Sequence, residues 1–116
     1  MFQRLFGKGA ASGVAQMTVA DLRQKLTARE PLQLIDVRSA EEYQHDRHIA
    51  GAKLIPLPAL AQRLGEITRD VPVAVICRSG NRSQVAADML AGQGYASVSN
   101  VQGGMMAWQR AGYPTR

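Results

Sequence analysis

Short apolar runs alternate along this chain with segments of helical periodicity, and this alternation limits the fold more than any other feature. The runs LQLIDV, GAKLIPL, VPVAVI and SVSNV are strand-like, and apolar residues recur at helical spacing between them. Strands that alternate with helices are typical of βαβ units and a parallel sheet. VPVAVI is apolar throughout, as expected for a strand covered on both faces. We therefore predict an α/β fold with an open, mainly parallel sheet and helices on both sides.

The helical segments are marked by their caps and by their apolar periodicity. Thr18 is a candidate N-cap, and Gly94 can supply the left-handed residue that often closes a helix. The predicted helices lie in MTVADLRQKL, from Ser39 through Tyr43, in PALAQRLGEI, from about Ser83 to Gly92, and in GGMMAWQRAG.

The length of 116 residues is that of one domain. The start, MFQRLFGKGAASGVAQ, lacks the continuous apolar stretch of a secretory signal, and no run approaches a membrane span. We expect residues 1–16 to form a flexible tail, with a docking segment through Phe2, Leu5 and Phe6 as the alternative. Residues 17–116 then form the domain. One cysteine cannot form an internal disulfide, which favours the cytoplasm, where thiols stay reduced.

The charge balance indicates a small anionic ligand rather than a polymer. The net charge is +5, and Arg78 and Arg82 are the only charged residues between Val71 and Ala87. A nucleic-acid binder would more often interleave a basic stripe with aromatics, which make up only 5% of this chain. We expect neither nucleic acid nor a membrane as partner, and we expect a monomer.

Cys77 ends the apolar run VAVI and begins the polar loop CRSGNRS. A lone cysteine is often only a small hydrophobe. This one stands where a buried strand meets a glycine-bearing loop and the start of a helix, which is where ligands bind in open α/β sheets. We therefore interpret Cys77 as a nucleophile rather than as a packing residue.

The loop can turn its amides toward the Cys77 sulfur, because Gly80 has access to backbone dihedrals closed to other residues. The start of the following helix adds positive potential. Such surroundings should lower the thiol pKa from about 8.5, and an ionised nucleophile needs no histidine base. Arg78 and Arg82 can both offer forked donors to a tetrahedral oxyanion. The amides that we expect to face the sulfur are those of Ser79, Gly80, Asn81, Arg82 and Ser83.

Three segments resemble successive motifs of single-domain rhodaneses: IDVRSAEEYQHDRHIAGAKLIPL, VICRSGNRSQVAADML and VQGGMMAWQRAGYP. The resemblance covers about Met17 to Pro114. It implies a central five-stranded sheet in a rhodanese-like domain. It also implies thiosulfate sulfurtransferase activity through a Cys77 persulfide, with cyanide or a thiol as acceptor and no cofactor or metal. The implied substrate-binding residues are Arg78, Ser79, Gly80, Asn81, Arg82 and Ser83.

Two other functions stay open. Phosphatases and arsenate reductases use a similar loop, but with five residues between cysteine and arginine, whereas four separate Cys77 from Arg82. The shorter loop argues against them. A persulfide carrier that serves a partner protein in a sulfur relay would use the same Cys77 chemistry.

The remaining polar residues are expected to support the site. Asp36 ends a strand and could pair with Arg82 or Arg38, so we assign Asp36 and Arg38 to the support of the loop. A turn or helix-end role is expected for His45 and His48. The last helix should pack on the sheet through Met105, Met106 and Trp108, with Met106 or Trp108 at the pocket rim as the alternative. Glu41 and Glu42 are adjacent and therefore no catalytic pair.

Overall fold

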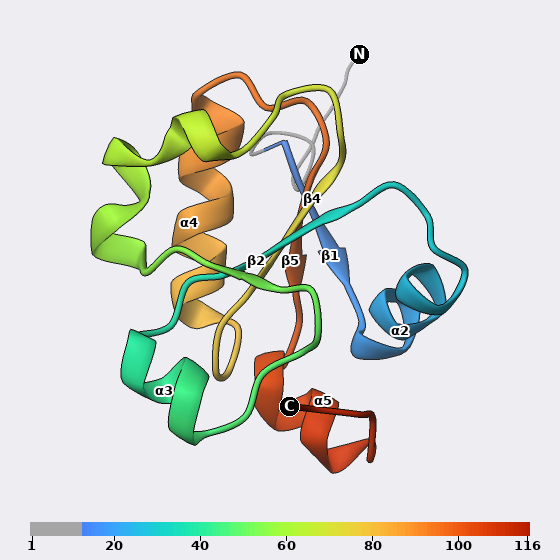
Figure 1. Cartoon of the computed structure of the whole chain (residues 1–116). Coiled ribbons are helices and arrows are strands. Elements are labelled where there is room, and N and C mark those ends of the chain that lie inside the picture. The colour runs from blue at the N-terminus through green and yellow to red at the C-terminus, as the bar shows by residue number, and fades with distance from the viewer. Residues whose placement is uncertain (1–12) are drawn as a thin grey trace.

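The computed structural model describes residues 13–116, which form a five-stranded sheet with the strand order β1-β5-β4-β2-β3 (Figure 1). All four strand pairings are parallel. This confirms the predicted α/β fold. The strands are β1 (Val14–Met17), β2 (Gln33–Asp36), β3 (Lys53–Leu54), β4 (Val73–Ile76) and β5 (Val98–Val101). The helices are α2 (Val19–Thr27), α3 (Ala40–His45), α4 (Asn81–Gly92) and α5 (Gly104–Arg110), with 3₁₀ helices η1 (Leu57–Gln62) and η2 (Leu64–Glu66).

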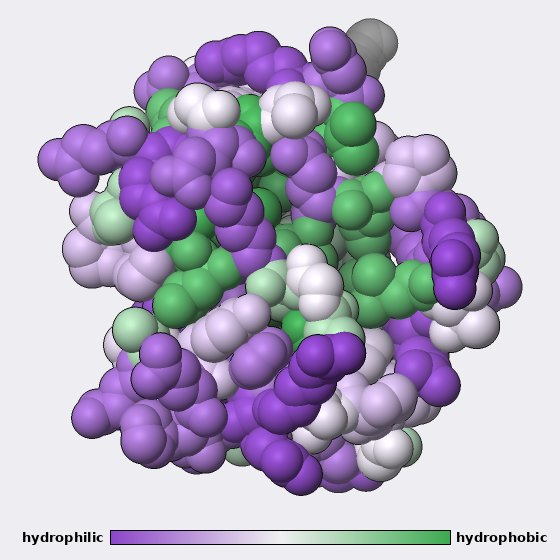
Figure 2. Space-filling view, in the orientation of Figure 1, coloured by the Kyte–Doolittle hydropathy of each residue, from purple (hydrophilic) through white to green (hydrophobic). Residues whose placement is uncertain are grey.

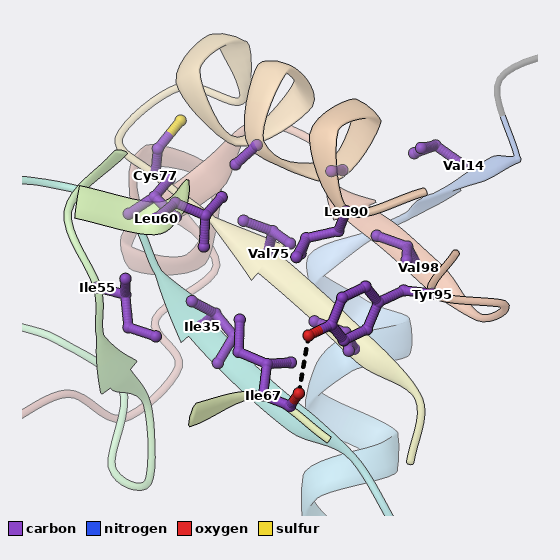
Figure 3. Packing of buried hydrophobic residues seen from close by; sticks show 14 residues of the cluster. Val14, Ile35, Ile55, Leu60, Ile67, Val75, Cys77, Leu90, Tyr95 and Val98 are labelled. Carbon is purple, nitrogen blue, oxygen red and sulfur yellow. Dashed lines mark hydrogen bonds between the residues drawn. The ribbon is translucent and has the colours of Figure 1, made fainter. Parts of the chain in front are cut away.

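Helices cover both faces of the sheet, and the sheet divides the core into two clusters. In Figure 1, α4 and the two 3₁₀ helices lie on one side, and α2 and α5 lie on the other. Side chains alternate along a strand. Val73 and Val75 therefore pack toward α4, while Ala74 and Ile76 pack toward α2 and α5. Cys77 continues the first series, and Figure 3 shows it beyond the end of β4 at the edge of the α4-side cluster.

The predicted caps are present. Thr18 is the N-cap of α2 and accepts a hydrogen bond from the amide of Asp21, and Gly94 follows α4 in the left-handed region at φ +90°. Ser39 begins α3 with a capping box, in which its hydroxyl and the Glu42 carboxylate each accept from the other residue's amide. Helix α4 begins at Asn81, two residues before the predicted start.

The segment PALAQRLGEI is not the single helix that we predicted. It forms η1 and η2, which are separated at Arg63. The apolar positions Leu57 and Leu60, then Leu64 and Ile67, are each three residues apart, which suits a 3₁₀ helix as well as an α-helix. Leu60 and Ile67 are buried in the α4-side cluster (Figure 3).

The ordered sheet begins before the predicted domain boundary at residue 17. Val14–Gln16, expected in the tail, form most of β1, and Val14 is paired with Val98 in parallel register. The run VAQM is too short and too weakly apolar to indicate a strand without its partner β5. Phe2, Leu5 and Phe6, the residues of the docking alternative, lie outside the described residues. Within residues 13–116 no helix has the length and apolar character that a membrane crossing requires.

Candidate active site

The cysteine that follows β4 lies at the carboxyl end of the sheet, between that strand and the start of α4. Cys77 is 1% exposed, and the loop Cys77–Gly80 leads directly into α4. Gly80 is the helix N-cap with φ +105°, where a Cβ would lie 3.3 Å from the amide nitrogen of Gly103. Glycine is therefore favoured at this turn, mainly for its dihedrals and also because the space for a Cβ is tight.

The sulfur of Cys77 is surrounded by hydrogen-bond donors. The amides of Gly80 and Ser83 donate to Sγ at 3.1 Å and 3.3 Å, and Ser83 Oγ lies 3.3 Å away. Of the five amides that we expected to face the sulfur, these two make the hydrogen bonds at these distances, and a further contact from the Ser79 amide also lowers the thiol pKa. Burial alone raises the pKa of the Cys77 thiol, but the Ser83 hydroxyl and the three amides outweigh it, so the pKa lies below its ordinary value. The loop therefore favours a thiolate.

A chain of polar side chains runs from the buried Ser83 along the α4 face of the sheet to the edge strand β1, and we did not predict it. Ser83 Oγ donates to Asn100 Oδ1 at 2.6 Å, and Asn100 Nδ2 donates to Gln16 and Gln84, each at 3.1 Å. A hydroxyl has one proton, so Ser83 can serve either the sulfur or Asn100 at a time. Asn100 is a buried polar residue inside the strand SVSNV, and that was the available signal.

Helix α5 supports the loop from below. The amides of Met105 and Met106 donate to the carbonyl oxygens of Cys77 and Arg78 at 2.9 Å and 3.0 Å. Because C=O and N–H of a trans peptide point in opposite directions, these bonds also fix the direction of the next amides of the loop. Gly104 makes this approach possible: it has φ +55°, and a Cβ there would overlap the Cys77 carbonyl oxygen and lie 2.6 Å from that of Arg78.

Arg82 pairs its guanidinium with a carboxylate on α3. Its Nη1 and Nη2 donate to the two carboxylate oxygens of Glu42 at 2.7 Å and 2.8 Å. These hydrogen bonds, opposed by partial burial and assisted by Ser39, lower the pKa of Glu42 to about 2. The same pairing raises the pKa of Arg82, to which the nearby Cys77 and Asp36 also contribute. We expected Arg82 to offer both donors to an oxyanion, whereas both are occupied by Glu42.

Arg78 is the loop cation without a partner in residues 13–116. Its side chain is exposed, and it borders a pocket of about 310 Å³ between α3 and α5. The other lining residues are Arg38, Asp46, Arg47, Met105, Met106 and Gln109. Met106 thus reaches a pocket rim, while Trp108 is buried on the sheet.

Of the two arginines considered for Asp36, the structure selects Arg38. Arg38 Nη2 lies 2.8 Å from Asp36 Oδ2 and Nε lies 3.0 Å from Oδ1, and both residues are at most 2% exposed. Arg38 Nη2 also donates to the backbone oxygen of Arg47 at 2.8 Å. The pair ties the end of β2 to the chain beyond α3.

The histidines take no part in the cysteine site. His45 ends α3, and His48 stacks on Tyr43 with ring centroids 3.8 Å apart. The described residues contain no group of three or more His, Cys, Asp or Glu side chains that could hold a metal ion.

The comparisons with known proteins agree with this geometry. The family model of the Rhodanese-like domain matches residues 18–111. The chain is 40% identical over 81 residues to the thiosulfate sulfurtransferase GlpE of Pseudomonas savastanoi pv. phaseolicola, covering 70% of this chain and 74% of GlpE. It is 37% identical over 98 residues to the "Putative sulfur carrier protein YrkF" of Bacillus subtilis, covering 84% of this chain and 52% of that protein. The chain thus spans about half the length of that relative.

A solved structure gives the same result. The crystal structure of a rhodanese-related protein from Thermoplasma volcanium superposes with a TM-score of 0.79 at 33% identity. The match covers 88% of this chain and 97% of that one. The match of the family model over most of the chain, on a fold that places Cys77 at the carboxyl end of its central strand, means that this protein belongs to the rhodanese-like domain family.

Proposed function

We propose that this protein is a sulfurtransferase that moves the outer sulfur of thiosulfate to a thiophilic acceptor through a persulfide on Cys77. The proposal rests mainly on the surroundings of the Cys77 sulfur. The amides of Gly80 and Ser83 donate hydrogen bonds to it, and the pKa of the thiol is lowered. The lowered pKa favours the thiolate, and a thiolate can attack without a separate base.

The first half-reaction conserves atoms and electrons. The Cys77 thiolate attacks the outer sulfur of thiosulfate, a new S–S bond forms, and the old S–S bond breaks. Sulfite leaves with the electron pair of the broken bond. Arg78 directly follows the nucleophile in the sequence and is exposed, and it is the cation that we propose receives the departing charge.

The second half-reaction restores the enzyme. Cyanide or a thiolate attacks the outer sulfur of the persulfide, and the electron pair returns to Cys77 Sγ. The hydrogen-bond donors that stabilise the Cys77 thiolate as the nucleophile also stabilise it as the leaving group. The same loop therefore serves both half-reactions. Thiocyanate or an acceptor persulfide is the product.

The loop length favours sulfur transfer over phosphate chemistry. Four residues separate Cys77 from Arg82, one fewer than in the phosphatase-type loop, and Arg82 is engaged by Glu42. We therefore expect no hydrolysis of phosphate esters.

A persulfide carrier is the second candidate, supported by the name of the Bacillus relative. It shares the first half-reaction and differs in the acceptor, which would be a partner protein. In either role the thiol must remain reduced, which fits the cytoplasm.

The test is the mass of the intact protein after treatment with thiosulfate. We expect a gain of one sulfur atom that cyanide removes with formation of thiocyanate. Cys77→Ser should show neither, although the hydroxyl is similar in size. Because Cys77 is the sole cysteine, the adduct cannot lie on a second thiol. A wild-type protein that gains no cyanide-labile sulfur would refute the proposal, and persulfide formation without multiple turnover with small acceptors would favour the carrier.

A further inference from the structure

The pocket between α3 and α5 holds more positive than negative charge. Arg47 and Arg78 line it, and in residues 13–116 neither side chain has a hydrogen bond or ion pair. Asp46 contributes one carboxylate. Arg38 also faces the pocket, but its charge is balanced by Asp36. Arg47 and Arg78 against Asp46 leave a surplus of one positive charge, and Arg78 directly follows the nucleophile in the sequence.

The backbone of Arg47 points to a role for its side chain. Arg47 has φ +69°, a left-handed conformation that a glycine adopts without the cost a larger residue bears. Its carbonyl is held in place by Arg38, so the conformation is imposed by the fold. A long cation at a position that favours glycine is uncommon, and of the two arginines with positive φ in residues 13–116 Arg47 is the one that lines this pocket.

The pocket also has room and an apolar wall. Its volume of about 310 Å³ reaches the range of small-molecule sites, roughly 300–1,000 Å³. Met106, 41% exposed, lies on α5 opposite Arg47, which follows α3. Figure 2, in the orientation of Figure 1, shows hydrophilic residues gathered over α3 and around α5 at this end of the molecule. An organic anion with a short carbon chain fits this combination better than cyanide.

We infer that Arg47, together with Arg78, selects the sulfur acceptor, and that the preferred acceptor is a small thiol that carries one or more carboxylates. The inference rests on the proposed function and names the acceptor class of that site. The acceptor's thiol loses its proton to water, and its thiolate attacks the outer sulfur of the Cys77 persulfide. The S–S bond of the persulfide breaks, its electron pair returns to Cys77, and the acceptor leaves as a persulfide. The arginines bind the carboxylate throughout and exchange no atoms.

The experiment isolates the second half-reaction. Protein loaded with thiosulfate and freed of excess donor is mixed with mercaptosuccinate, 2-mercaptoethanol or cysteamine, and loss of the added sulfur is followed by intact mass. Rates are compared per thiolate and corrected for the rise of thiolate nucleophilicity with thiol pKa, which follows a Brønsted slope of about 0.4–0.5. We expect mercaptosuccinate to react fastest and cysteamine slowest.

Arg47→Gly is the decisive variant, and Arg29→Gly is its matched control. Both arginines have positive φ, +69° and +56°, and both lack a side-chain partner, but Arg29 lies after α2 and outside this pocket. Each change therefore removes one charge and leaves a backbone that glycine accepts. Arg47→Gly should lower the ratio of mercaptosuccinate to 2-mercaptoethanol rates roughly tenfold, as for a lost charge-assisted contact, and Arg29→Gly should keep the wild-type ratio. Asp46→Asn should raise that ratio.

The outcomes separate the two proposals. If no persulfide forms with thiosulfate, the proposed function fails and the inference falls with it. If the persulfide forms and turns over, but the acceptors show no charge preference, the inference alone is overturned. An equal loss in Arg47→Gly and Arg29→Gly also overturns it, since it would mean a general field effect. If Arg47→Gly does not fold, as judged by circular dichroism, Arg47→Asn gives the same readout, because asparagine also tolerates this conformation.

Discussion

Glu42 engages both terminal nitrogens of Arg82, across 40 positions of sequence, and so connects α3 to the first turn of α4. The same carboxylate closes the capping box with Ser39. Glu42 thus links the helix after β2 to the loop that surrounds Cys77. Both terminal nitrogens of Arg82, which we expected to meet an oxyanion, are paired with Glu42 in this structure.

This pairing predicts an acid-dependent contribution to stability. The folded-state pKa of Glu42 is about 2, below its ordinary value of 4.5. The stability that the ionised Glu42 contributes is therefore fully present above pH 4.5 and is lost as the pH falls toward 2. The two side chains are 40% and 23% exposed, which limits the contribution to about 1 kcal/mol or less. Glu42→Gln keeps a capping-box side chain without the charge. Urea unfolding should show the variant less stable at pH 7 and nearly equal to wild type near pH 2. An equal difference at both pH values would contradict the charge effect.

The lowered pKa of Cys77 predicts the pH dependence of its reactivity. Alkylation by iodoacetamide should rise with pH through a midpoint below the ordinary value for cysteine, because the thiolate is the reacting form. Ser83→Ala should move this midpoint to higher pH, since one donor to the sulfur is lost. Ser79→Ala is the control: it removes an exposed hydroxyl and keeps the amide.

The result also reports the direction of the Ser83 proton. A midpoint that stays in place or moves to lower pH in Ser83→Ala would mean that the hydroxyl donates to Asn100 rather than to the sulfur. The backbone amides alone would then hold the thiolate.

The sequence was sufficient to predict the features that depend on local pattern. A few adjacent residues are enough to indicate each of these features: the alternation of strands and helices, the caps at Thr18 and Gly94, and the change from apolar to polar at Cys77. The partners of Arg82 and of Asn100 depend on which strands and helices become neighbours, and no local signal encodes that. The segment 57–67 was mispredicted because a spacing of three suits two kinds of helix.

Gly104 predicts a dependence of activity on backbone packing. Gly104→Ala would place a Cβ against the carbonyls of Cys77 and Arg78, at φ +55°. Gly112→Ala is the matched control, because it has φ +76° and nothing within 4 Å of the added atom. The control should lose about 1 kcal/mol through its dihedrals alone. Gly104→Ala should lose roughly 1–3 kcal/mol more, from overpacking, together with most sulfur transfer. Similar losses in unfolding free energy for both variants would show that the loop yields to the added atom.

The buried pair of Asp36 and Arg38 predicts the largest loss of stability from a change that preserves size. Asp36→Asn leaves the Arg38 charge in an environment 2% exposed and without a counter-ion, which typically costs about 3–5 kcal/mol. Glu30→Gln, in the exposed pair with Lys25, should cost less than about 1 kcal/mol. Urea unfolding measures both.

Replacing both partners by apolar residues, Asp36→Leu with Arg38→Met, should recover part of the loss, since no lone charge remains buried. Arg38 also holds the carbonyl of Arg47, so the double variant should not recover the preference for anionic acceptors even where it recovers stability. A double variant that restores both would mean that the pair acts only through folding and that Arg47 keeps its position without it.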